Sequence, residues 1–590
     1  MTDAAALPLS AAGAGLRRGA RVPQAWVLDP ASDLLLIVAA PLLSLAAALL
    51  VMWRFGAGRG ATLMITAHIV LTVAHHLPTF IRIYGDVELF RRFRWHFLLA
   101  PLIPLAFASA VLVYLNWRGL PLEHALYLYV FLALWDPWHF LRQHFGFMRI
   151  YDRLNRAPAQ LAARMDWWLC VTWVVYIMLA SGAWIPSLLD DLQRDAAIPA
   201  ALAITPGALE IAGLLSGAAA GAMTLVYAAY LVWCRRRGFV ISVPKLALVI
   251  CTFGVMYLTY TPNEWILALA PAWGFKVGFA TVGIVHMTQY LAIVWRYDRR
   301  LAQDPARARA GWFRWLHARP TRWGVVLAAL CYVLVCLAYG EAITQRPGSR
   351  ALLSVILVAG FTSTLLHYYF DGFIWKMRHT QNRAVLGLDD GDVPTPGGSS
   401  RSAAGAASRP ADIASWWSAA RAPAPLRLLA RQFVYFALPL GVLTAGAVTV
   451  WNGDPRGYVE HMQAAQAYGS GGNLPDAARE AQAARARMEA TLPMARRMAE
   501  LQPSSAREAE LAFLVFNAAY YDGYVLPALA GRHLDATAAA RLRGATAEAA
   551  ELLERALARG GSVAHPGRPE LTREEATQVL RAWRQRAQVG

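Results

Sequence analysis

The stretch LWDPWHFLRQHFGFMRIYDRLNR, residues 134–156, begins as an apolar, aromatic helix and ends as a basic loop. Two histidines, His139 and His144, lie where the character of the sequence changes. Ionisable side chains are costly inside a bilayer, and those that occur there usually face the interior of a helix bundle and have a function. The stretch therefore predicts a membrane helix with a candidate site near its polar end.

The rest of the chain has the composition of a multi-pass membrane protein. Its 590 residues are 57% hydrophobic and 16% charged, with a mean hydropathy of +0.35. Apolar runs of about 20 residues, the length that spans a bilayer, recur between residues 32 and 451. We expect an all-α integral membrane protein with about eleven transmembrane helices, near residues 32–53, 61–81, 96–116, 123–145, 167–189, 208–234, 239–260, 265–295, 323–343, 351–375 and 428–451.

The charge pattern predicts how these helices are oriented. Most of the basic residues behind the formal charge of +18 lie in alternate loops, such as RRFRWH at 91–96 and RRR at 235–237. Cytoplasmic loops carry this excess of Lys and Arg. The pattern argues against nucleic acid as a partner. It predicts a protein of a bacterial-type inner membrane, surrounded by membrane lipids, with a cytoplasmic N-terminus and an extracytoplasmic C-terminal domain.

Composition also divides the chain into parts. We expect a cytoplasmic segment at 1–30, a histidine-rich membrane core at 31–384, a flexible Gly/Ser/Ala/Pro-rich cytoplasmic linker at 385–427 and a last membrane helix at 428–451. Residues 452–590 are rich in Ala, Glu and Arg and are helical by pattern. Their beginning resembles one tetratricopeptide (TPR) repeat, and a plain helical hairpin fits it equally well. In either case we expect a soluble module that packs or binds a protein partner.

Seven histidines fall within the expected membrane helices, all on helices that run toward the cytoplasm. At a rise of 1.5 Å per residue they lie in one layer near the inner leaflet, with one of them, His68, deeper. Polar residues three or four positions away share a helical face with several of them and are placed to orient a ligating imidazole. The candidate metal ligands are His68, His75, His76, His139, His144, His286, His367 and Asp371; the orienting partners are Asp136, Gln143, Gln289 and Tyr290.

A buried layer of imidazoles has several explanations. Neutral imidazole binds iron, zinc and copper, and seven imidazoles with a carboxylate exceed what one ion takes, so two ions are expected. A proton or ion pathway, haem ligation and helix–helix hydrogen bonds remain open alternatives. A transporter typically shows an internal repeat, and no convincing one is found in the sequence.

Two histidine groups resemble boxes of known membrane enzymes. HFLRQH, from His139 to His144, has the HxxxxH spacing of a histidine box in membrane fatty-acid desaturases and hydroxylases, and AHH, with His75 and His76, is similar to the paired histidines of another box. The chain has no HxxHH box. Its multi-pass, histidine-rich layout also resembles that of the Brp/Blh carotenoid-cleaving dioxygenases. Haem–copper oxidases have paired histidines too, but their HPEVY stretch is missing.

The resemblance implies a membrane-bound oxidoreductase with two histidine-bound iron ions and O₂ as co-substrate. Such an enzyme would hydroxylate, desaturate or cleave a lipid-like substrate that reaches the site from the bilayer. The chain has no phosphate-binding glycine loop and no Rossmann fingerprint, so an external electron donor is expected. The alternative is a transporter or a redox subunit whose histidines carry protons, cations or haem. No catalytic residue is assigned.

Three side chains outside the candidate site carry simpler expectations. Lys245 lies near the cytoplasmic end of an expected helix and should extend its ammonium group to the membrane surface. His317 and His379 lie in cytoplasmic loops, and their substitution should be near neutral.

Overall fold

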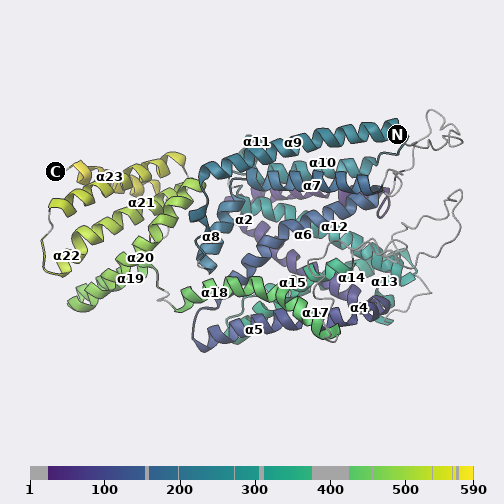
Figure 1. Cartoon of the computed structure of the whole chain (residues 1–590), viewed down its shortest axis with the longest axis horizontal. Coiled ribbons are helices and arrows are strands. Elements are labelled where there is room, and N and C mark those ends of the chain that lie inside the picture. The colour runs from purple at the N-terminus through teal and green to yellow at the C-terminus, as the bar shows by residue number, and fades with distance from the viewer. Residues whose placement is uncertain are drawn as a thin grey trace, which may run out of the picture.

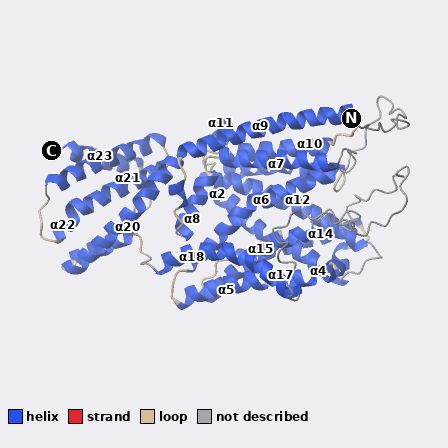
Figure 2. Ribbon diagram, viewed as in Figure 1, coloured by secondary structure: helices blue, strands red, loops and turns tan. Residues whose placement is uncertain are grey.

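The structure, a computed structural model, describes residues 24, 26–152, 159–196, 198–271, 273–303, 311–374, 424–452, 456–533, 536–560, 563–566 and 570–588. Within these ranges the regular structure is helical apart from one isolated bridge between Val563 and Leu571, as Figure 2 shows. The all-α prediction is confirmed for this part of the chain. The predictions for most of the N-terminal segment and of the linker concern residues outside it.

The membrane part extends from α1 to α18. Its helices are α1 (Pro30–Asp33), α2 (Ala40–Ala74), α3 (His76–Gly85), α4 (Val87–Leu99), α5 (Leu102–Trp117), α6 (Tyr127–Tyr151), α7 (Ala159–Ala180), α8 (Trp184–Ala196), α9 (Pro206–Arg236), α10 (Val243–Tyr260), α11 (Glu264–Leu269), α12 (Phe275–Gln303), α13 (Gly311–His317), α14 (Arg322–Thr344), α15 (Arg350–Ile374), α17 (Ala424–Gln432) and α18 (Leu438–Asn452).

Nine helices in the described ranges are long and apolar enough to cross a membrane, or ten if one bent pair near the N-terminus is a single span. This is fewer than the eleven expected. The expected helix 123–145 exists as α6, but it is not among the candidates. Its second half carries Asp136, His139 and His144, and these polar residues lower its hydropathy. The helix that carries much of the candidate site is therefore the one that composition does not identify as a span.

Helix α12 lies at the centre of the membrane part, and α9 lies at its edge. In the most apolar window of each helix, 67% of α12 is buried but only 11% of α9. Helix α12 packs along α2, which also packs against α14. The approach of α14 depends on Gly340, where an added Cβ would lie 2.3 Å from the carbonyl oxygen of Val70. Close packing around α2 and α12 thus fixes the positions of the histidines that these helices carry.

A buried ion network joins α6, α7, α9 and α10. Lys245 Nζ lies 2.7 Å from Asp152 Oδ2 and 3.1 Å from Asp166 Oδ1, and Arg149 contacts the same two carboxylates at 3.0 and 2.6 Å. The Tyr227 hydroxyl donates to Asp166 Oδ1 at 2.8 Å. The expectation that Lys245 reaches the surface is wrong. Its side chain is fully buried because two carboxylates supply the counter-charge inside the bundle.

His317 is also buried, whereas the sequence predicted a cytoplasmic loop position at which substitution would have little effect. Its ring is 1% exposed, packs against Trp295 and Tyr332, and has Nδ1 3.0 Å from the Phe313 carbonyl oxygen. Burial lowers the pKa of His317 to about 4, so the imidazole is neutral at physiological pH. Its Nε2 lies 4.0 Å from Asp298 Oδ2. His379 lies outside the described residues.

The C-terminal helices lie together at one end of the molecule, beyond α8 and the beginning of α9 (Figure 1). They are α19 (Tyr458–Ser470), α20 (Leu474–Leu501), α21 (Ser505–Tyr520), α22 (Leu526–Leu529), α23 (Ala536–Arg559) and α24 (Arg573–Gln588). Helix α19 packs on α20, α20 on α21, α21 on α23, and α23 on α24. The expected helical C-terminal region is present; its likeness to a TPR repeat stays a prediction.

These helices contact the membrane part through α20. Met494 and Met498 pack with Leu189 of α8 and with Ala201 of the short 3₁₀ helix η4 (Ala200–Ala203). The C-terminal region therefore lies on the same side of the bundle as the connection between α8 and α9. Which side faces the cytoplasm stays a prediction.

Candidate metal centre

Four imidazoles from different helices meet inside the membrane part. His75 lies at the junction of α2 and α3, His139 on α6, His286 on α12 and His367 on α15. One ring nitrogen of each lies within 4.8 Å of those of the other three. The four residues are 2%, 8%, 5% and 0% exposed, respectively. We refer to them as the four-histidine group.

The four rings form a closed cycle. Neighbouring ring centroids are 5.2 Å apart for His75 and His286, 4.9 Å for His286 and His139, 4.9 Å for His139 and His367, and 4.4 Å for His367 and His75. Each neighbouring pair is close to perpendicular, with interplanar angles between 75° and 85°. Together with the short nitrogen separations, this arrangement turns the rings toward a shared centre.

Several buried ring nitrogens of the group have no hydrogen-bond partner within the described structure. They are Nε2 of His75 and both nitrogens of His286. The Nε2 atoms of His139 and His367 face each other at 3.2 Å. A buried polar atom without a partner costs about 1–3 kcal/mol. The presence of several such atoms in one place therefore requires an explanation. A metal ion that accepts one lone pair from each imidazole would account for one such nitrogen per ring.

The size of the group suits one ion. Imidazole nitrogen binds zinc at about 2.0–2.1 Å, so neighbouring ligand nitrogens around a tetrahedral ion are about 3.4 Å apart. The Nε2 atoms of His139 and His367 are already 3.2 Å apart, and separations of up to 4.8 Å within the group must shorten to reach that value. Burial in apolar surroundings also favours the neutral form of imidazole, which is the form that binds metal. The residues present therefore fit a single histidine-bound ion.

Asp371, Tyr290 and Thr79 form a hydrogen-bonded group beside His367. The Tyr290 hydroxyl donates to Asp371 Oδ1 at 2.7 Å, and Thr79 Oγ1 lies 2.8 Å from His367 Nδ1 and 3.3 Å from Asp371 Oδ1. If His367 donates from Nδ1 to Thr79, its Nε2 lone pair faces the other imidazoles. Asp371 Oδ2 lies 3.8 Å from Nε2 of both His139 and His367, so this carboxylate borders the group.

Thr79 was not among the candidates from the sequence. It is four residues after His75 and three after His76, so helical spacing alone could have indicated it. Tyr290 was expected beside His286 on α12, and the structure instead bonds it to Asp371 on α15. A spacing rule finds neighbours on one helix, whereas this contact lies between two helices.

The other three expected partners make different bonds. Gln143 donates to the backbone oxygen of His286 at 3.0 Å and so joins α6 to α12. Gln289 donates to the Ile37 carbonyl at 2.9 Å. Asp136 accepts from the Tyr368 hydroxyl at 3.1 Å. All three connect helices around the site, and none of these bonds is to an imidazole ring.

His76 lies beside the group. Its ring stacks on that of His367, with centroids 4.7 Å apart and an interplanar angle of 25°. Its Nδ1 is 3.1 Å from Ser363 Oγ, which accepts a hydrogen bond from the Tyr339 hydroxyl at 2.8 Å. The ring therefore supports the position of His367, and its hydrogen bond to Ser363 holds it at the edge of the group.

His68 and His144 lie outside the four-histidine group. The His68 ring occupies the space that Gly283 leaves open, since an added Cβ there would lie 2.3 Å from two ring atoms. His144 packs against Phe140 and Phe253 with centroids 6.4 and 5.0 Å away. His139 and His144 are five residues apart, which is about 140° around a helix. The two ends of the HxxxxH stretch therefore face different neighbours.

A small cavity adjoins the group. His75 and His286 line it together with His68, Asp136 and apolar side chains that include Phe140 and Met256. Its volume is about 30 Å³, which is room for one or two molecules of the size of water. A small molecule in this cavity would lie directly beside two of the four imidazoles.

No family model matches the chain, and no curated protein or solved structure shows significant similarity to it. The resemblance to histidine-box enzymes therefore rests on the two motifs and on the site itself. From these motifs the structure brings His75 and His139 into the group, with His76 beside it and His144 apart.

Proposed function

We propose that the protein is a membrane-embedded metalloenzyme, an oxidoreductase that uses O₂ to hydroxylate, desaturate or cleave a lipid-like substrate. The observation that carries the proposal is the buried four-histidine group with its unpartnered ring nitrogens. Imidazole donors suit iron, zinc and copper, and iron with open positions is the usual choice for O₂ chemistry. One group of this size holds one ion, so we propose one iron per chain in place of the two expected from the number of histidines.

When bound, iron would supply the redox chemistry with O₂. His75, His139, His286 and His367 would hold the ion. Thr79 Oγ1, 2.8 Å from His367 Nδ1, would fix the tautomer of His367 by accepting a hydrogen bond from that nitrogen. The adjoining cavity, of about 30 Å³, has the volume for O₂. Asp371 Oδ2, 3.8 Å from two Nε2 atoms of the group, is placed to accept or return a proton.

The proposed lipid-like substrate follows from the position of the site among candidate membrane helices. The cavity of about 30 Å³ does not accommodate an acyl or isoprenoid chain beside the group. Entry of such a chain would therefore require side chains around the cavity to move. Electrons would come from an external donor.

Haem is less well supported than a single ion. A porphyrin needs a flat space next to an axial imidazole, whereas each ring of the group contacts two other rings at centroid distances of 4.4 to 5.2 Å. A proton or cation pathway remains the competing function. It would use the same imidazoles without a bound redox metal.

Two substitutions on one helix test the metal site. His139→Ala removes a member of the group, and His144→Ala removes a buried histidine of α6 that lies outside it. In purified full-length protein we expect His139→Ala to lose iron and His144→Ala to retain it. Equal iron in the two variants would show that the site is elsewhere.

Oxygen uptake tests the reaction class. Iron-loaded protein in nanodiscs of membrane lipid extract, supplied with a chemical reductant, should consume O₂ faster than the His139→Ala variant. A Soret band in the purified protein would favour haem. Iron-loaded protein without O₂ uptake would contradict the proposed reaction class, and purified protein that binds no iron would favour the ion pathway.

A further inference from the structure

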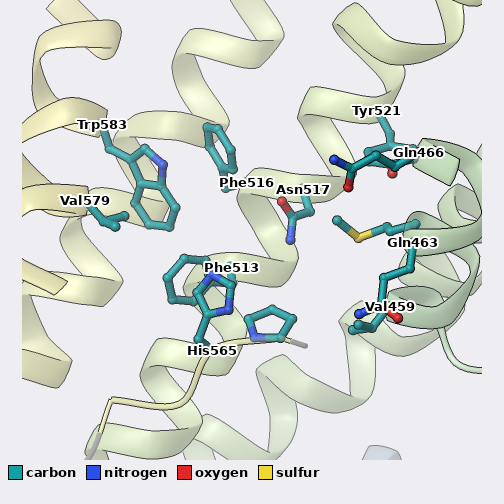
Figure 3. A pocket seen from close by; sticks show the side chains of 12 residues that line it. Val459, Gln463, Gln466, Phe513, Phe516, Asn517, Tyr521, His565, Val579 and Trp583 are labelled. Atoms are coloured by element: carbon teal, nitrogen blue, oxygen red, sulfur yellow. The ribbon is translucent and has the colours of Figure 1, made fainter. Parts of the chain in front are cut away.

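The C-terminal helices contain a second, larger cavity that the proposed metalloenzyme does not use. Its volume is about 450 Å³, within the range of about 300–1,000 Å³ usual for ligand pockets. Its walls come from α19, α21 and α24, with the Tyr521 side chain at one end and a connecting segment at His565 at the other (Figure 3). The intervening helices α20 and α23 pack behind these walls. The pocket is thus formed by alternate helices of the array.

One wall of the pocket is aromatic. Phe513 and Trp583 are 5% and 6% exposed and contact each other edge to face, with centroids 5.1 Å apart. Phe516 stacks on Trp583 at 4.8 Å and 25°. The ring faces are largely covered by one another. This wall therefore offers an apolar surface and little open ring face on which a sugar could stack.

The opposite wall, from α19, combines the amides of Gln463 and Gln466 with the apolar side chains of Val459 and Met462. Gln463 and Gln466 of α19 are exposed and face the aromatic wall, and the Asn517 amide points between the two walls (Figure 3). Each amide side chain offers both hydrogen-bond donors and acceptors. Among the residues that the structure describes, no Asp, Glu, Lys or Arg lines the pocket.

The absence of charge from the pocket contrasts with the surrounding helices, which carry ion pairs such as Arg485 with Asp522 and Arg496 with Glu548. Burying an unpaired charge in such a place is costly, so the pocket selects an uncharged ligand. A peptide bond pairs with an amide side chain in both directions, through its N–H and its C=O. An apolar side chain suits the aromatic wall.

We propose that this pocket binds an uncharged segment of another polypeptide. The main chain of the segment pairs with Gln463, Gln466 and Asn517, and one of its apolar side chains lies against Phe513 and Trp583. The C-terminal region then serves as a docking module attached to the membrane part through the contact between α20 and α8. The proposal does not depend on the metal centre.

Selection from a library of short random peptides, blocked at both ends and displayed on phage, tests the proposal. The target is the full-length protein in nanodiscs, and empty nanodiscs remove non-specific binders. We expect enriched peptides without Asp, Glu, Lys or Arg and with at least one large aliphatic residue. A synthetic peptide of the enriched sequence then gives a dissociation constant for each variant.

Gln466→Glu places a charge on the polar wall at an exposed position, so the fold should persist. We expect it to weaken binding of the synthetic peptide by about tenfold or more, because the charge must be desolvated in the complex. Gln482→Glu is the matched control, because Gln482 on α20 is also exposed and does not line the pocket. The Gln482→Glu variant should bind the synthetic peptide with the same affinity as the unmodified protein.

Four results would overturn the proposal. They are no enrichment over empty nanodiscs, enrichment of charged peptides, equal affinities of Gln466→Glu and Gln482→Glu, and binding of a neutral oligosaccharide instead of peptide on a glycan array. Asn517→Leu, which nearly keeps the side-chain volume, gives a second variant for which weaker peptide binding is expected.

Discussion

Replacement of Tyr290 by phenylalanine removes a single hydroxyl group from the polar cluster beside His367. That hydroxyl donates to Asp371 Oδ1 at 2.7 Å and lies 2.5 Å from Thr79 Oγ1, and Thr79 contacts His367 Nδ1 at 2.8 Å. The phenylalanine ring keeps the shape of the side chain, so the packing of α12 against its neighbours should persist. The substitution therefore isolates the effect of the hydrogen bonds on the imidazole that they orient.

The expected size of the effect follows from these bonds. A hydrogen bond to a charged group contributes about 1.5–3 kcal/mol net, and loss of a partner that orients a metal ligand typically lowers affinity by about 10–100-fold. The second figure corresponds to about 1.4–2.7 kcal/mol of metal-binding free energy. We expect Tyr290→Phe to weaken iron binding about 10–100-fold without changing the amount bound at saturation.

Competition with a chromophoric chelator measures this affinity in the purified full-length protein. Tyr127→Phe is a matched control, because the Tyr127 hydroxyl also bonds a threonine in the membrane part, at 2.7 Å from Thr444 Oγ1. Its iron affinity should equal that of the unmodified protein. If Tyr290→Phe binds iron as tightly as Tyr127→Phe, the assigned role of the Tyr290–Asp371–Thr79 cluster is wrong.

Three further predictions concern the rest of the chain. Lys245→Met leaves buried carboxylates short of a cation and should lower the free energy of unfolding by about 3–5 kcal/mol in denaturant titrations; an unchanged value would contradict the assigned network. Hydrogen bonding by His461 lowers the pKa of Glu480 below its ordinary 4.5, so its stabilisation is present above about pH 4.5 and is lost as pH falls through the lowered pKa. Glu480→Gln should remove this acid-sensitive step from thermal melts, and its persistence would argue against the pair. A reporter active only outside the cytoplasm should be active when fused after Gly590 and silent in the 385–427 linker; the reverse would invert the topology.

The sequence predicted the helical membrane part well because bilayer thickness imposes apolar runs of a set length. It also predicted the helix at 123–145, which exists as α6, although α6 is not among the described helices apolar enough to be candidate spans. It also predicted that His75, His139, His286 and His367 lie at one depth, since distance from a basic loop fixes depth along a helix. These predictions use only positions along single helices.

Rotation about the helix axis is set by neighbouring helices, and here the sequence was less informative. His139 and His144 were both candidates, yet only the first faces the centre. Two ions were expected from the number of imidazoles, whereas packing gathers four of them and leaves His68 beside Gly283. Contacts across helices, such as that of Tyr290 with Asp371, cannot be obtained from spacing along one chain segment.

Lys245 and the C-terminal pocket illustrate the same limit. The carboxylates that pair with the buried Lys245 ammonium group come from two other helices. No sequence pattern around residue 245 indicates them. The walls of the pocket are separated by more than a hundred residues between Gln463 and Trp583. Local sequence shows that each helix has a polar and an apolar face. Which faces enclose a cavity depends on the order in which the helices pack.

The iron content of the purified full-length protein, with and without His286→Ala, tests the central claim most directly. Both ring nitrogens of His286 lack a partner within the described structure, and this residue belongs to the four-histidine group. We predict about one iron per chain in the unmodified protein and almost none in the variant, with both proteins equally well folded. Two irons per chain, or equal iron in the two proteins, would contradict a single ion held by His75, His139, His286 and His367.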